Sequence, residues 1–126
     1  MEQAQERFIK ENKVSLTING KEFKSHFAGD EVPRWVFNCT LKANGRQYTV
    51  NFGQSYHNGD KAPELEDVLA CLTKYDVGDF GDFCAEFGYD EWDRESKRIY
   101  KAVLREYRNV VRLFGEETER LGGLFY

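Results

Sequence analysis

The sequence predicts an α+β fold in which an antiparallel sheet of about four strands carries helices on one face. Three observations lead to this prediction. Apolar and polar residues alternate, as they do in strands, up to Phe52. After Pro63 the apolar residues recur at helical spacing, and this continues to Phe114. Because the strands precede the helices instead of alternating with them, we expect antiparallel hairpins and not a parallel sheet.

Length and composition indicate one folded domain spanning residues 1–126, since 40% of the residues are hydrophobic and 15% are aromatic. No apolar run approaches the roughly 20 residues that cross a bilayer. The start of the chain lacks the basic-then-apolar pattern of a secretion signal, so we expect a cytoplasmic protein. Cys39, Cys71 and Cys84 form no Cys-x-x-Cys pair and lie in apolar patterns, which predicts buried free thiols.

The N-terminal part predicts a short amphipathic helix from Glu2 to Asn12 and then a first hairpin. Val14 to Ile18 alternates with the period of a strand. Asn19-Gly20 is typical of a tight hairpin turn. The alternating positions from Phe23 to Phe27 therefore predict the second strand of this hairpin.

A second hairpin is predicted from Trp35 to Phe52. Asn44-Gly45 supplies the two residues with positive φ that a type I′ turn requires. A two-residue loop fixes the register, so every pair on one face is apolar. The expected pairs are Leu41 with Tyr48, Cys39 with Val50, and Phe37 with Phe52.

The C-terminal half predicts a helical layer packed on the sheet. One helix follows Pro63 and ends near Leu72, and a second runs from Phe80 to Phe87. Asp79 is the expected N-cap of the second helix and Gly88 its left-handed C-cap, after which Tyr89 folds back onto Phe83 or Cys84. The longest helix runs from about Asp93 to Phe114 and ends at Gly115, and a last turn from Glu116 to Leu121 precedes an apolar end. The apolar face of the longest helix contains Ile99, Tyr100, Val103, Leu104, Tyr107, Val110, Val111 and Phe114.

The search for catalytic motifs argues against an enzyme. The chain contains no phosphate-binding glycine loop, no His-Glu-x-x-His and no nucleophile elbow. His26 and His57, the only histidines, have no cysteine or histidine at ligand spacing, so we expect no metal and no cofactor. The polar loop 53–62 around His57 is a candidate contact site, because loops of this kind often carry recognition.

The charges are sorted along the chain. From Glu64 to Asp93 there are ten acids and one base, Lys74, a net charge of −9 in a chain of net charge −4. The acids that would form a partner-binding surface are Glu64, Glu66, Asp67, Asp76, Asp79, Asp82, Glu86, Asp90 and Glu91.

The longest helix carries the opposite charge. Seven cations fall within an arc of roughly 100° on the side away from its apolar face. They are Arg94, Lys97, Arg98, Lys101, Arg105, Arg108 and Arg112. Solvated helices usually mix signs to gain i,i+4 pairs, so this basic face needs acids from elsewhere. Either the acidic segment folds alongside and pairs with it, at little energetic gain, or a partner supplies the complementary charges.

A segment of the second helix and the residues after it, Asp82-Phe83-Cys84-Ala85-Glu86-Phe87-Gly88-Tyr89-Asp90, resembles a widespread family of small bacteriophage and prophage proteins. Val68–Leu72, the hairpin from Phe37 to Phe52 and the basic helix belong to the same resemblance, which covers most of the chain beyond the N-terminal helix. The family commonly continues Asp-Ser-Arg, where this chain has Trp92-Asp93-Arg94. The residues by themselves suit a structural role, since the phenylalanines have core spacing and Gly88 ends a helix.

The resemblance implies a phage protein in the cytoplasm of a bacterial host, and small non-catalytic phage proteins often block host defences. The leading hypothesis is therefore an anti-CRISPR-like inhibitor that binds a nuclease or surveillance complex, with acidic residues in place of nucleic-acid phosphates. The alternative is a nucleic-acid-binding accessory protein that uses Arg94, Arg98, Lys101, Arg105, Arg108 and Arg112.

Overall fold

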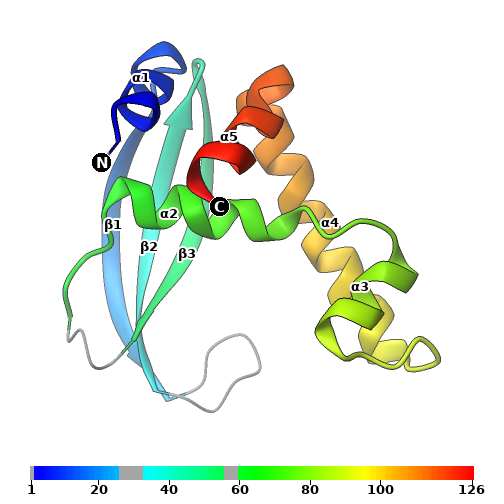
Figure 1. Ribbon diagram of the computed structural model, residues 1–126. Coiled ribbons are helices and arrows are strands. Elements are labelled where there is room, and N and C mark those ends of the chain that lie inside the picture. The colour runs from blue at the N-terminus through cyan, green and yellow to red at the C-terminus, as the bar shows by residue number, and fades with distance from the viewer. Residues whose placement is uncertain (1, 26–32, 56–59) are drawn as a thin grey trace.

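A computed structural model describes residues 2–25, 33–55 and 60–126, and it has the predicted α+β class (Figure 1). The elements in chain order are α1 (Gln3–Glu11), β1 (Ser15–Lys24), β2 (Arg34–Ala43), β3 (Arg46–Ser55), α2 (Leu65–Leu72), η2 (Thr73–Tyr75), α3 (Phe80–Phe87), α4 (Arg94–Phe114), η3 (Gly115–Glu117) and α5 (Thr118–Phe125). The described strands form one antiparallel sheet in the order β1-β2-β3. None of the described helices is both long and apolar enough to cross a membrane.

The hairpin of β2 and β3 has the predicted turn and register. Asn44 and Gly45 adopt φ values of 54° and 78°. Leu41 pairs with Tyr48, Cys39 with Val50 and Phe37 with Phe52. These side chains are buried except for Phe52, which is half-buried, so the apolar face of the hairpin is the face that packs on the core.

The prediction of about four strands is wrong, because the described residues form three strands, and the first hairpin does not turn at Asn19-Gly20 as expected. Residues 15–24 make a single strand, β1, and Asn19-Gly20 forms no turn. Gly20 lacks the positive φ of such a turn, and the ladder with β2 only shifts register between Ile18 and Gly20. The Asn19 amide donates to Asn38 Oδ1 at 2.9 Å and to Thr40 Oγ1 at 2.8 Å, contacts with β2 that stabilise a bulge instead. Phe27, expected in the fourth strand, lies outside the described residues.

The main core lies between one face of the sheet and the helices. Leu41 of β2, Leu69 of α2, Leu113 of α4 and Leu121 of α5 are all buried in it, and Phe8 of α1 closes one side. Figure 1 shows α2 crossing this face of the sheet. Phe8 near the N-terminus and Phe125 near the C-terminus both belong to this core, so the same core holds the first and the last helix.

A second, smaller core lies between α3 and α4, where Val77, Phe83 and Cys84 are buried together. Asp79 caps α3 by accepting a hydrogen bond from Asp82 N at 2.8 Å, and Gly88 ends it with φ 74°, both as predicted. Tyr89 folds back so that its ring stacks on Phe83 with the centroids 5.2 Å apart. Residues 77–108, called the helical lobe below, project away from the sheet (Figure 1).

The buried face of α4 changes along the helix. Val111, expected on its apolar face, is 39% exposed, whereas Leu113 is 1% exposed. The reason is that the first half of α4 packs on α3 through Ile99 and Val103, while its last turns pack on the sheet and α5. The two halves of α4 bury different sides, so one apolar stripe along the whole helix does not predict which residues are buried.

We expect the folded chain to lose stability at high pH because of Tyr75 in η2. Burial, with a contribution from Cys71, raises the pKa of its hydroxyl from 10.0 to about 12. As the pH rises, the unfolded chain therefore loses this proton before the folded chain does. The contribution of the protonated Tyr75 to folding stability is complete below pH 10 and is lost between pH 10 and 12. Allowing for the exposed part of the ring, the loss is about 1–2 kcal/mol. Urea unfolding at pH 9 and pH 11.5 should show a smaller decrease for Tyr75→Phe than for the unchanged chain, and equal decreases would contradict this assignment.

Candidate binding site on the helical lobe

The basic face predicted for α4 is present on its surface. All seven cations of the face are exposed. α4 is a regular helix of 21 residues that begins after its N-cap Asp93, whose side chain accepts from Glu95 N at 3.0 Å. Its unbroken geometry places cations spaced three and four residues apart on one side.

Two of these cations are engaged within the fold. Arg98 forms an ion pair with Glu95, one turn earlier, which raises the pKa of Arg98 and lowers that of Glu95. Arg112 Nη2 donates to Gln47 O of β3 at 2.7 Å, and Arg46 Nη1 donates to Arg112 O at 2.8 Å. Arg112 therefore ties α4 to the edge of the sheet, and we remove it from the candidate binding residues.

Four other cations surround a groove of about 540 Å³ on the lobe. Its floor is apolar and consists of Phe80, Tyr100 and Leu104. The rings of Phe80 and Tyr100 lie 5.4 Å apart, and the Tyr100 hydroxyl donates to Gly78 O at 2.8 Å, which fixes this ring. The cations around the floor are Lys97, Lys101, Arg105 and Arg108. These four cations and the apolar floor are together called the basic groove below.

The predicted acidic surface divides into two groups. Glu64, Glu66 and Asp67 lie at the start of α2, at the end of that helix away from the lobe (Figure 1). The lobe group lies on α3 and the turn that follows it, and its members are exposed: Asp79, Asp82, Glu86, Asp90 and Glu91. Asp76 stands between the groups and lines a different cavity. The nine acids thus cannot act as one continuous surface.

The acids and the basic groove do not neutralise each other. Among the described residues, no ion pair joins an acid of residues 64–91 to a cation of the basic groove, whose four cations form no ion pair at all. Some acids have local roles instead: Glu64 and Asp67 form the capping box of α2, and Asp90 accepts from Trp92 N at 2.9 Å. The alternative in which the acidic segment pairs with the basic face is therefore not what the described residues show.

The three thiols supply no reactive group to this site. Cys39 and Cys84 are buried and Cys71 is half-buried, all three as free thiols. Burial raises the pKa of each, which keeps the thiols protonated and unreactive at neutral pH. No group of three or more candidate metal ligands occurs in the described parts of the chain. His26, and His57 with its loop 56–59, lie outside them.

The floor of the groove was missed in the sequence, where Tyr100 and Leu104 were assigned to the core and Phe80 to a core stripe. For Tyr100 and Leu104 a signal was present, because Lys97, Lys101, Arg105 and Arg108 flank them, several at spacings of three and four. Residues at the border of an apolar stripe and a basic arc are half-buried and accessible to a partner.

A comparison of the chain with protein-family models, with curated proteins and with solved structures finds no match. The resemblance to a phage family stays a prediction.

Proposed function

We propose that the chain is a non-catalytic phage protein that binds a component of a host defence system, such as a CRISPR effector, and inhibits it. The observation that supports binding is the basic groove: four cations that form no ion pair with any described residue line an apolar floor on a projecting lobe. Protein interfaces commonly combine an apolar centre with a polar rim, and arginine and tyrosine are enriched among the residues that contribute most to binding.

The charge balance of the lobe favours a protein partner over nucleic acid. Residues 77–108 contain eight acids and six bases, a net charge of −2. A surface that follows a nucleic-acid backbone is usually positive overall, because each phosphate contact is made by a cation. Exposed acids and bases on one lobe, most of them without an ion pair to a described residue, suit a protein surface that carries both signs in the complementary arrangement.

Nucleic-acid binding is the second candidate, and one observation favours it. The Phe80 and Tyr100 rings lie within the ring of cations, and aromatic rings beside cations bind single-stranded nucleic acid by stacking and phosphate contact. This mode would use Lys97, Lys101, Arg105 and Arg108, without Arg112 and with Arg98 already paired to Glu95.

The test reverses two charges of the groove. Purified CRISPR effector complexes, with and without guide RNA, are passed over the immobilised chain and over its Arg105→Glu, Arg108→Glu double variant. We expect the double variant to weaken retention at least about tenfold, since it replaces two attractive contacts by repulsive ones. The matched control is Arg7→Glu with Lys10→Glu on α1, which makes the same change in net charge on another exposed surface and should stay within about twofold.

Three outcomes separate the candidates. Retention of an effector that survives nuclease treatment and is lost in the groove variant supports the protein partner. Retention of single-stranded DNA or RNA alone, lost in the same variant and reduced by salt, supports the second candidate. If the groove variant and the α1 variant behave alike, the basic groove is not the binding site.

A further inference from the structure

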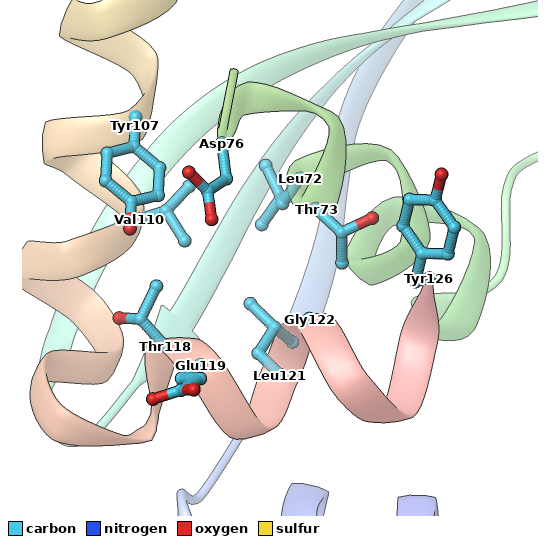
Figure 2. A pocket seen from close by; sticks show the side chains of 10 residues that line it. All are labelled: Leu72, Thr73, Asp76, Tyr107, Val110, Thr118, Glu119, Leu121, Gly122 and Tyr126. Carbon is cyan, nitrogen blue, oxygen red and sulfur yellow. The ribbon is translucent and has the colours of Figure 1, made fainter. Parts of the chain in front are cut away.

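A second cavity, of about 480 Å³, lies where α2 and η2 meet α4 and α5 (Figure 2). It contains none of the residues of the basic groove. Its walls come from three separate segments: Thr73 and Asp76 after α2, Tyr107 of α4, and Thr118 and Glu119 of α5. Cavities of this volume are in the range that holds small ligands.

The threonine and carboxylate side chains of this cavity offer acceptors only, whereas the hydroxyls of Tyr107 and Tyr126 can both donate and accept. Thr73 Oγ1 donates to Ala70 O and Thr118 Oγ1 donates to Gly115 O, each at 2.7 Å. Both hydroxyl protons are thus used within the fold, and only the oxygen lone pairs remain for a ligand. Asp76 and Glu119 are carboxylates, which accept hydrogen bonds and do not donate them when ionised.

The two carboxylates have no counter-ion among the residues that the structure describes. Neither Asp76 nor Glu119 forms an ion pair with a described residue, and no described lysine, arginine or histidine lines the cavity. Arg120, next to Glu119 in sequence, is held by Glu11 at 3.2 Å and by Glu117 at 3.0 Å. Figure 2 shows Asp76 and Tyr107 entering the cavity from different segments. Burial, then Asp76 and then Glu119, raise the pKa of Tyr107, so the fields of both carboxylates reach this hydroxyl.

Apolar side chains form the remainder of the inner wall. Leu72 of α2, Val110 of α4 and Leu121 of α5 are each about 1% exposed and belong to the main core. A ligand must therefore bring an apolar stem for this wall and a positive group rich in donors for the rim. An ammonium has three donors and no acceptor.

We propose that this cavity binds a protonated alkylamine, with the alkyl chain against Leu72, Val110 and Leu121 and the ammonium between Asp76 and Glu119. Two sources share this chemistry, a free aliphatic diamine and the lysine side chain of another protein. The site is separate from the basic groove, so its test does not depend on the proposed function.

The experiment titrates the full-length chain, labelled with ¹⁵N, with butane-1,4-diamine at constant ionic strength. Saturable shifts are expected for the amides of Thr73, Val110 and Gly122 around the cavity. Asp76→Asn combined with Glu119→Gln should weaken binding at least tenfold, while Glu116→Gln, which lies outside the cavity, should stay within twofold. All these acids are exposed, and thermal unfolding of each variant establishes that the fold is intact.

Two further arms define the ligand. Butan-1-ol has the same chain length without charge and should produce no saturable shift. Tighter binding of Nα-acetyl-lysine methylamide than of the diamine assigns the site to a protein side chain, and the reverse assigns it to a free amine. Equal affinity of the double variant and the unchanged chain, or shifts that fail to saturate, would overturn the proposal.

Discussion

Replacing Phe8 with alanine is expected to lower the free energy of unfolding by about 3–5 kcal/mol, the range for emptying a buried phenylalanine site. The side chain is 0% exposed and lies where α1, α4 and α5 meet. Its ring centroid is 5.6 Å from that of Phe114 and 5.8 Å from that of Phe125. The guanidinium of Arg120 covers it at 5.4 Å. Phe8→Ala removes the contacts of α1 with the last turns of α4 and α5 at once, and urea unfolding followed by circular dichroism measures the loss.

The matched control for this truncation is Trp92→Ala. Trp92 is 93% exposed, so removing its larger ring should change stability by less than about 0.5 kcal/mol. A loss below 1 kcal/mol for Phe8→Ala would mean that α1 does not pack against Phe114 and Phe125 as described.

Asn44→Ala is expected to lower the free energy of unfolding by about 3 kcal/mol, because it removes two hydrogen bonds and strains the turn. The Asn44 amide donates to Asn12 Oδ1 and to Leu113 O, each at 2.9 Å. Asn12 is only 3% exposed, so its oxygen would be left buried without a partner. Asn44 also has φ 54°, a conformation that costs alanine about 1 kcal/mol.

Two variants separate these contributions. Asn44→Gly accepts the positive φ and loses only the hydrogen bonds, so it should cost about 2 kcal/mol, less than alanine. Asn19→Ala also removes two side-chain hydrogen bonds, but on an exposed part of β1, and should cost less than about 1 kcal/mol. Equal losses for the alanine and glycine variants of Asn44 would show that the backbone conformation contributes nothing.

The parts of the fold that sequence predicts well are those set by neighbouring residues. The turn at Asn44-Gly45 fixes the register of β2 and β3 because only two residues separate the strands. The caps of α3, Asp79 and Gly88, satisfy backbone groups within their own turn. Each depends on chemistry within a few positions, which is visible in the printed sequence.

The prediction of a turn at Asn19-Gly20 was wrong because distant residues, not neighbouring ones, decide the structure there. Asn19-Gly20 has the composition of a turn, but pairing with β2 offers β1 a ladder along its whole length. The amide of Asn19 then finds its partners on β2, about twenty residues further along the chain. A contact of that separation outweighs a local preference, and no local pattern reveals it.

The candidate sites divide in the same way. The cations of α4 were predictable because helical periodicity alone places them on one side. The docking of Arg112 on Gln47 was not, since β3 lies about 65 positions earlier. The cavity that includes Asp76, Tyr107 and Glu119 combines segments distant in sequence, and only their packing places the two carboxylates around one cavity.

The polar face of the sheet is suited to the attachment of a label. Thr17, Thr49 and Asn51 are exposed there, and the Asn38 amide donates to Asn51 Oδ1 at 3.0 Å. Neither the basic groove nor the cavity lined by Asp76 and Glu119 includes a residue of this face. A fluorophore or an immobilisation tag attached at Thr17 or Thr49 would therefore leave both sites open to a ligand.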